Sequence, residues 1–217
     1  MIPLQVDVTD KDELAAATAQ IVADAGFVHL LVVNAGIPRP DLLGLDAANS
    51  SPGQLQDYVL RAWSNQDFLR PFATNVTGSY FTCAAFLGLL DKGNSNENRL
   101  PGVTSQVIVN SSISAYQKKY AGNRRYCLRN QQGSGEPNVQ PFKHVFCALS
   151  NPAEMTAPLF ADDKSGLGTG RLPAKRYGDE ADLARAVLYL ASRAGAYVNG
   201  LSLVVDGRLV RILLSTY

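Results

Sequence analysis

A nearly continuous apolar run at residues 28–33 (VHLLVV) constrains the fold of this chain most strongly. The run does not alternate between polar and apolar residues, so it predicts a strand of a parallel sheet covered by helices on both faces. Residues 12–25, just before it, carry apolar side chains at helical spacing, and residues 3–8 (PLQVDV) are typical of a strand. Strand, helix and strand in this order predict a right-handed crossover unit.

The rest of the chain continues the same alternation. Two helices are expected at residues 55–63 and 65–90, followed by a buried strand at 104–109, an amphipathic helix at 179–194 and a last strand at 201–205. This order of elements predicts an α/β fold with a doubly wound parallel sheet between two helical layers, that is, a three-layer α/β/α domain.

Composition excludes several other classes of protein. The chain has 217 residues, 46% of them hydrophobic, and a net charge of +1, which is typical of one globular domain and argues against a nucleic-acid binder. Its three cysteines form no CxxC pair, so neither a disulfide framework nor a metal site is indicated. The longest apolar run is far short of the roughly 20 residues that span a bilayer, and the N-terminus lacks the features of a signal peptide. We therefore expect a cytoplasmic protein with no membrane segment.

Polar or small residues follow several of the expected strands. They occur at Asp7 and Val8, at residues 34–36 (NAG), at residues 111–112 and at residues 206–207. Ligands of open α/β sheets bind at the carboxyl ends of the strands, which makes these four places candidates for a binding site. Each place by itself is more typical of a turn or a helix cap than of a binding site.

Taken together and in order, these segments resemble the short-chain dehydrogenase/reductase family, and in particular its ketoacyl-reductase-like branch. The resemblance extends over about residues 1–115 and 152–207. It is carried by DVTD at 7–10, NAG at 34–36, NVTG at 75–78, VIVNSSIS at 107–114, PAEMT at 152–156 and the segment 176–207. It implies that residues 1–217 form a single Rossmann-like domain that binds NADP or NAD and moves a hydride between nicotinamide and a small-molecule carbonyl or alcohol.

The same resemblance implies roles for eight residues. Two would be catalytic: Ser112 would hydrogen-bond the substrate oxygen, and Asn75 would hold a water of the proton relay. The other six would bind the cofactor. They are Asp7 and Val8 at the adenine, Asn34, Ala35 and Gly36 at the adenosine ribose, and Thr156 near the nicotinamide.

Two parts of the family's pattern are absent. The glycine-rich turn that binds pyrophosphate would lie before Met1, so we expect a domain that is incomplete at its N-terminus. The glycines at 166–170 follow no expected strand and are more typical of a flexible loop. The Tyr-x-x-x-Lys pair is missing as well, because Tyr120, Arg124 and Asn130 follow the candidate tyrosines at 116, 120 and 126 by four residues.

Residues 116–146 have neither a helical nor a strand period, which is unusual for a stretch of this length in a compact domain. Shifting the codons of residues 126–138 by one base permits T-A-Y-A-T-S-K-A-A-V-N, which matches the family's active-site tyrosine, lysine and following helix. We therefore hypothesise that residues 117–148 are translated in the wrong reading frame. A phosphate-binding patch at the basic residues 118–129 is the alternative.

Two functions remain open at this point. The first is an NAD(P)-dependent oxidoreductase that is impaired or inactive as printed. The second is a non-catalytic homologue that acts only as a partner subunit. The resemblance also implies a homo-oligomer, for which residues 65–90 are the candidate surface.

Ser112 as a hydrolase nucleophile would need a G-x-S-x-G turn and a nearby base, which the sequence lacks. His29 is interpreted as a core histidine with a hydrogen-bond partner.

Overall fold

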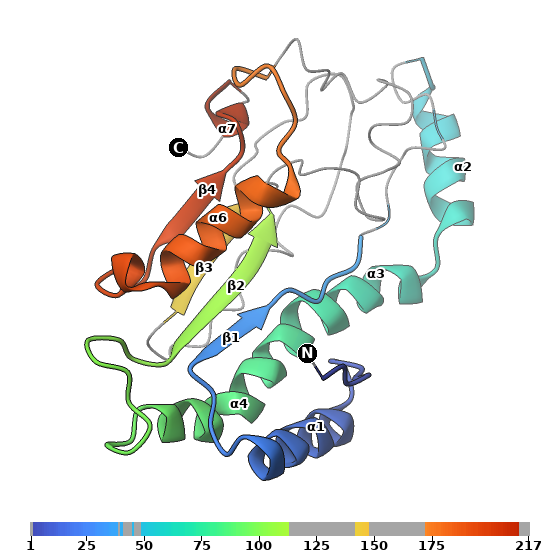
Figure 1. Ribbon diagram of the computed structural model, residues 1–217. Helices are drawn as coiled ribbons and strands as arrows, with labels where there is room; N and C mark the ends of the chain where they lie inside the picture. Colours follow the sequence, from blue (N-terminus) through green and yellow to red (C-terminus); the bar gives the residue numbers. More distant parts are fainter. Residues whose placement is uncertain are drawn as a thin grey trace.

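The computed structural model of the protein describes residues 2–38, 40, 45, 49–112, 142–147 and 172–212. In this part of the chain, four parallel strands form one sheet in the order β1-β2-β3-β4 (Figure 1). The strands are β1 (Leu30–Val33), β2 (Gln106–Ser112), β3 (Phe142–Cys147) and β4 (Ser202–Val205). Val33 is opposite Val109 and Ser112 is opposite Cys147, so the carboxyl ends of the strands lie along one edge. The predicted α/β class is confirmed.

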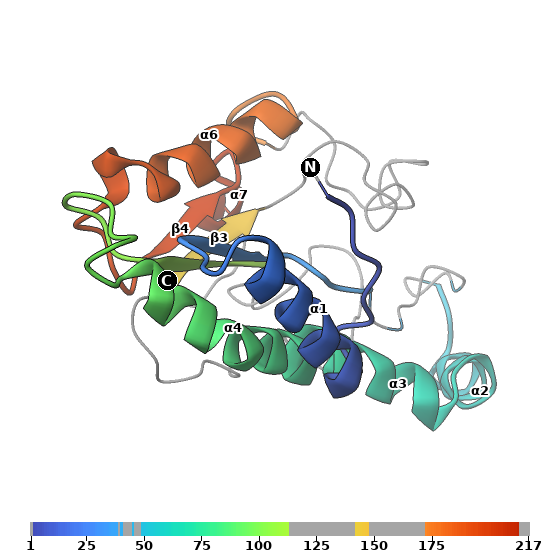
Figure 2. The ribbon, with the colours of Figure 1, turned by 60° about the horizontal axis from the view of Figure 1, so that its bottom comes forward.

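Helices cover both faces of the sheet. Figure 2 shows α6 (Glu180–Ala191) on one face and α1 (Lys11–Asp24) and α4 (Ser79–Gly93) on the other. One core lies between β1, β2 and α4 and contains Leu31, Val33, Cys83, Leu90 and Val107. A second lies between β2 and α6 and contains Ile108, Ala186 and Leu190. The three-layer α/β/α arrangement is therefore confirmed.

The first strand differs from its prediction. β1 was expected to be covered on both faces, but the side chains of Leu30 and Val32 are 37% and 43% exposed. They lie on the face opposite to the core with α4, and α6 packs over β2 and β4 instead. One face of β1 is therefore open in the described part of the chain, and the sequence-based expectation was wrong on this point.

The segment before α1 also differs from its prediction. Residues 3–8 form no strand, because no strand in the described ranges lies beside them to supply ladder bonds. They lead instead into a turn in which Asp10 N donates to Asp7 O at 3.0 Å. Asp10 then caps α1 by accepting from the backbone N–H groups of Asp12 and Glu13. The predicted helix at 12–25 is confirmed, while the strand–helix–strand unit is not formed.

The two helices expected at 55–63 and 65–90 are present. α2 (Pro52–Ala62) begins at a capping box formed by Ser51 and Gln54, and α3 (Asn65–Phe72) begins at one formed by Ser64 and Asp67. A π-helical turn, η1 (Ala73–Gly78), joins α3 directly to α4. The helical run from residue 65 to 93 is thus continuous but carries one irregular turn, which lies at the NVTG motif.

The C-terminal half adds one unpredicted strand and two short helices. β3 lies within the segment 117–148, and the rest of that segment is outside the described residues. α6 is followed by the 3-10 turn η3 (Arg193–Gly195), β4 and α7 (Leu209–Ile212). Within the described ranges, no helix is both long enough and apolar enough to cross a membrane.

Candidate cofactor and substrate site

The π-helical turn η1 presents Asn75, and its origin can be followed in the sequence. Pro71 lies inside the last turn of α3 and has no N–H to donate to the preceding turn. Thr77 Oγ1 donates to Ala73 O at 2.9 Å, a bond that competes with regular α-helical geometry. Single π turns of this kind are frequent at functional sites, because they change the direction of a side chain.

Asn75 connects the NVTG motif to the NAG motif. Its Oδ1 accepts from Ile37 N at 2.8 Å, and its Nδ2 donates to Ile37 O at 3.0 Å. The neighbouring Gly36 is so near that a Cβ there would lie 3.4 Å from Asn75 Oδ1. The amide therefore fixes the backbone that follows β1, over a sequence separation of 38 residues.

Gly78 connects the same turn to the DVTD motif. A Cβ at Gly78 would lie 3.0 Å from Val8 Cγ2, 3.1 Å from Val8 O and 3.0 Å from Ala73 O. These distances are shorter than nine in ten real Cβ contacts, so a side chain at this position would push its neighbours away by a few tenths of an ångström. The backbone of Val8 thus lies directly against η1, and two motifs that are 70 residues apart become neighbours.

Asp7 forms a tight turn with Thr9. Asp7 Oδ1 accepts from Thr9 N and from Thr9 Oγ1, both at 2.8 Å. These two bonds, of which the backbone bond is the larger effect, lower the pKa of the Asp7 carboxyl, which is therefore ionised at neutral pH. Glu13 Oε2 accepts from Asp7 N at 2.6 Å. The side chain is exposed, and its Oδ2 makes no hydrogen bond to the described part of the chain.

The ends of β1 and β2 are joined by a pair of asparagines. Asn110 Nδ2 donates to Asn34 Oδ1 at 2.7 Å, whereas the buried Oδ1 of Asn110 has no hydrogen-bond partner. Ser112 lies two residues further along β2, half-buried at the carboxyl edge of the sheet. The structure therefore brings the DVTD, NAG and NVTG motifs together around η1, and the asparagine pair links NAG to the strand that ends in Ser112.

These residues fit the adenosine part of a dinucleotide. Asn34, Ala35 and Gly36 are all exposed at the end of β1, and the Gly36 backbone carries no side chain that would keep a ligand away. The free Oδ2 of Asp7 is a charged acceptor of the kind that an exocyclic amino group needs. Thr156, which was expected near the nicotinamide, and the glycines at 166–170 lie outside the described residues.

Residues 206–207, the last of the four candidate binding places at strand ends, have a local structural role. Asp206 Oδ1 accepts from Arg208 N at 2.9 Å, and Asp206 Oδ2 accepts from Val210 N at 2.7 Å. Gly207 has a φ of 58°, in the left-handed region that favours glycine. Asp206 is thus the cap of α7, as the turn-and-cap interpretation of this motif predicted.

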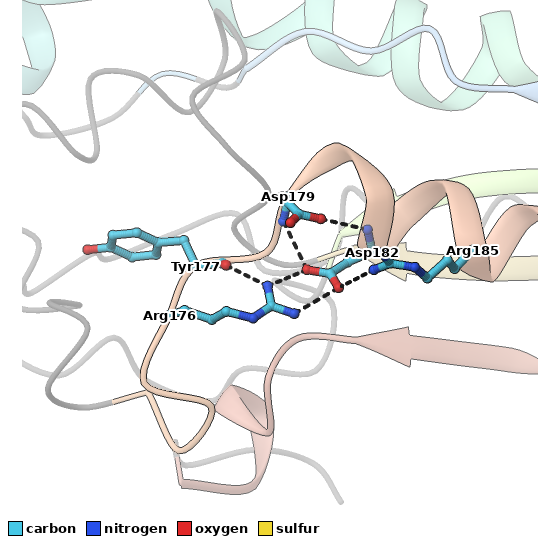
Figure 3. Close-up of polar contacts among 5 residues, drawn as sticks. All are labelled: Arg176, Tyr177, Asp179, Asp182 and Arg185. Carbon is cyan, nitrogen blue, oxygen red and sulfur yellow. Dashed lines mark hydrogen bonds and ion pairs between the residues drawn. The ribbon is translucent and has the colours of Figure 1, made fainter.

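An ion-pair cluster at the start of α6 was not found by sequence reasoning (Figure 3). Asp182 accepts from both terminal nitrogens of Arg176, one of them at 2.8 Å, and from Arg185 at 3.4 Å. Asp182 also exchanges capping bonds with Asp179. Because Arg176 favours the charged carboxylate, the pKa of Asp182 is well below its usual value. Arg176 and Arg185 are exposed, whereas Asp182 is half-buried, and the cluster ties residues 176–179 to α6.

Glu13 was also missed, although the sequence held a signal for it. A glutamate three residues after a capping aspartate, here Asp10, is the pattern of a capping box. In a regular capping box Glu13 would accept from Asp10 N, but here it reaches back to Asp7 N. The usual rule therefore predicts a bond from this side chain but assigns the wrong partner.

His29 has an ordinary structural partner, as expected. Its Nε2 lies 2.8 Å from Asn98 O, and its ring packs edge to face against Phe27. Among the residues described, no group of three or more His, Cys, Asp or Glu side chains could hold a metal ion.

Comparison with known proteins gives a consistent result. Residues 1–127 match the family model described as short chain dehydrogenase. Short-chain dehydrogenase/reductase SAT3 of Stachybotrys chartarum is 34% identical and covers all of this chain, which spans 88% of that protein. The 3-oxoacyl-[acyl-carrier-protein] reductase FabG of Haemophilus influenzae is 27% identical over 95% of this chain and 77% of its own length.

Among solved structures, a gluconate 5-dehydrogenase from Burkholderia cenocepacia in complex with NADP and tartrate matches with a TM-score of 0.66. Its sequence identity is 20%, and the match covers 95% of this chain and 74% of that one. This likeness shows the shared fold. The family model matches more than half of this chain, and the alignment with the Stachybotrys relative covers all of this chain. The chain belongs to the short-chain dehydrogenase/reductase family of NAD(P)-dependent oxidoreductases.

Proposed function

We propose that the chain binds NADP or NAD at the cluster around η1 and acts on a small-molecule carbonyl or alcohol. In the family's reaction, a hydride passes between the nicotinamide ring and the carbon that bears the substrate oxygen. The observation that carries the proposal is the double hydrogen bond from Asn75 to Ile37, because it fixes the exposed NAG backbone beside the DVTD turn.

The adenosine part of the cofactor would occupy the DVTD and NAG segments. Asp7 would accept a hydrogen bond from the adenine amino group, and Val8 would contact the ring. The adenosine ribose would lie along Asn34, Ala35 and Gly36, whose backbone is exposed. Thr156 would contact the cofactor near the nicotinamide. The bound cofactor would supply or accept the hydride.

Ser112 and Asn75 would act on the substrate oxygen and its protons. The Ser112 hydroxyl would donate a hydrogen bond to the substrate oxygen and stabilise the negative charge that develops there. Oδ1 and Nδ2 of Asn75 each make one bond to Ile37, and a relay water would be held by the remaining hydrogen-bonding capacity of Asn75.

We further propose that turnover by this chain is low. No tyrosine of the printed sequence is followed four residues later by lysine, so the usual acid and its pKa-lowering partner are missing. Loss of a general acid typically costs about 10²- to 10⁴-fold in rate. The segment 117–148, which we hypothesise to be read in the wrong frame, would have supplied the pair.

Two measurements on the same sample test these statements. Fluorescence enhancement of NADPH and NADH on titration with the chain reports cofactor binding, and carbonyl-dependent loss of absorbance reports turnover. We expect binding with little or no oxidation. Absence of binding would contradict the cofactor site, whereas rapid carbonyl-dependent oxidation would contradict the low turnover. Sequencing the transcript tests the reading-frame hypothesis separately.

Association with a second subunit is the alternative function that an observation favours. Large apolar side chains are exposed along the helical run from residue 65 to 93: Leu69 at 58%, Phe72 at 39%, Tyr80 at 47% and Leu87 at 41%. Exposed apolar side chains of this kind are candidates for a protein interface. We propose that the chain forms a homo-oligomer through it. Sedimentation equilibrium tests this, and a monomer at every concentration would contradict the homo-oligomer.

A cytoplasmic location is part of the same proposal. Cys83 is a free, buried thiol in the core beneath α4, and burial raises its pKa to about 11. A free cysteine is typical of proteins in reducing compartments. Imaging of a fluorescent fusion in its host cell tests the location, and a signal confined to a secretory compartment would contradict it.

A further inference from the structure

We propose that Glu13 is a positioning residue for adenine recognition, which acts by holding the backbone of Asp7. It would thereby keep the second carboxylate oxygen of Asp7 in the orientation that accepts the adenine amino group. This inference rests on the proposed cofactor site of the preceding subsection and assigns a role to a residue outside its motifs.

Glu13 makes a bond that the helix itself does not need. Asp10 already accepts from the free N–H groups of Asp12 and Glu13 at the start of α1. Asp10 N is satisfied by Asp7 O at 3.0 Å. The Glu13 carboxylate is therefore not required for capping, and it lies 2.6 Å from Asp7 N instead.

The bonds around Asp7 leave one acceptor available. Its N–H donates to Glu13, its C=O accepts from Asp10 and its Oδ1 accepts twice from Thr9. Oδ2 is the remaining polar atom, and it has no bond to the described part of the chain. Fixing both ends of the Asp7 backbone and one carboxylate oxygen leaves the second oxygen with a defined direction.

The opposite side of the turn is held by α4 and η1. Val8 lies so near Gly78 that a Cβ there would be only 3.0 Å from Val8 Cγ2, and the Lys11 ammonium lies 4.1 Å from the centre of the Phe81 ring. The DVTD turn is thus anchored to the helix on one side and by Glu13 on the other. Because Asp7 is exposed, losing the Glu13 contact would leave its N–H in water at little cost to folding.

The chemistry of the base provides a readout that a purely structural role would not change. Adenine donates from its 6-amino group, whereas hypoxanthine carries a carbonyl oxygen at that position and would face the carboxylate with a second acceptor. A correctly held Asp7 therefore distinguishes the two bases, and a mobile Asp7 distinguishes them less. The ratio of the two affinities measures the orientation of Asp7 independently of turnover.

The experiment uses the full chain and two pairs of probes. NADPH and NADH are titrated against their hypoxanthine analogues by fluorescence, with thermal unfolding recorded for each variant. Glu13→Ala removes the contact, and Glu13→Asp keeps the charge but is too short to reach Asp7 N. Glu13→Gln retains an acceptor at the same reach. Asp12→Ala is the matched control, because it removes an acid from the same helical turn without touching Asp7.

We expect the wild-type chain to prefer adenine by about tenfold or more, as for a hydrogen bond to a charged group. Glu13→Ala and Glu13→Asp should reduce this preference to about twofold, while Glu13→Gln and Asp12→Ala should keep most of it. An unchanged preference in both Glu13→Ala and Glu13→Asp, or an equal loss in Asp12→Ala, would overturn the role of Glu13 and leave the cofactor site standing. Failure of the wild-type chain to bind either base would overturn the cofactor site itself.

Discussion

The side-chain amide of Asn75 bonds both the N–H and the C=O of Ile37. These two bonds are long-range in sequence, because they join a π-helical turn to the loop after β1. The amide thus holds the two peptide groups on either side of Ile37, and it fixes the backbone on which the proposed ribose contact depends.

Substituting Asn75 should therefore affect stability and binding together. Asn75→Ala leaves two partly buried backbone groups of Ile37 without partners, and we expect a loss of about 1–3 kcal/mol in the free energy of unfolding. Cofactor affinity should fall as well, because the NAG backbone is no longer fixed. Urea unfolding and NADPH titration measure the two effects.

Asn75→Asp separates the two bonds to Ile37. It keeps an acceptor for Ile37 N but turns a second oxygen toward Ile37 O, so it should be at least as destabilising as Asn75→Ala at neutral pH. Wild-type stability in both variants would show that the two bonds contribute nothing measurable.

Gly78→Ala tests the close contact between Val8 and η1. The added Cβ would lie within about 3 Å of two carbonyl oxygens, which belong to the backbone and cannot move aside like a flexible side chain. We expect a loss of about 1–3 kcal/mol in unfolding free energy. Gly88→Ala, in the middle of α4, is the matched control because nothing lies within 4 Å of its Cβ position. It should stabilise the protein by about 0.5–1 kcal/mol.

Asp7→Asn should reverse the base preference of the proposed site. The two donors of Thr9 require an acceptor, so the new amide would keep its oxygen toward Thr9 and turn its NH₂ group toward the ligand. A donor at this position favours the hypoxanthine oxygen over the adenine amino group. Titration with both dinucleotides measures the ratio, and a variant that still prefers adenine would argue that the base lies elsewhere.

The Arg176–Asp182 pair should make stability depend on pH in a defined window. The pKa of Asp182 is lower in the folded chain than the ordinary aspartate value of 3.8, so its contribution is present above about pH 4 and is lost as the pH falls through the folded pKa. Arg176→Ala should therefore lower the melting temperature at pH 7. It should also reduce the fall in melting temperature that occurs as the pH is lowered below about 4. Because Arg176 is exposed, we expect a small effect that decreases with salt. Arg185→Ala, whose contact with Asp182 is longer at 3.4 Å, should change the profile less.

The helices and the sheet type could be predicted because each depends on short-range patterns. Residues 12–25 and 179–194 carry an apolar stripe, and the structure has a helix at both, capped by Asp10 and Asp179. Residues 3–8 look equally like a strand, but a strand also needs a neighbour, which a local pattern cannot show. β3 was missed for a related reason, since Lys143 and His144 interrupt the apolar run that a central parallel strand normally has.

The candidate site was predictable only as an ordered set of motifs. Their convergence depends on contacts such as Val8 with Gly78, which no local pattern contains. The sequence could not specify that Asp206 caps α7 or that Glu13 bonds to Asp7, because several local arrangements are compatible with the same residues. The order of the motifs along the sequence therefore identified the family, while the direction of each side chain could be seen only in the three-dimensional structure.

The π turn has a consequence for helical phase. Relative to an α-helix, a π turn inserts one residue, which corresponds to a rotation of about 100° about the helix axis. In a regular α-helix, exposed side chains of α3 and α4 would face the same direction. The inserted residue, which directs Asn75 toward Ile37, rotates those of α3 away from those of α4. Leu69 and Leu87 consequently do not belong to one straight seam, and a subunit that contacts both must follow a bent surface rather than a coiled coil.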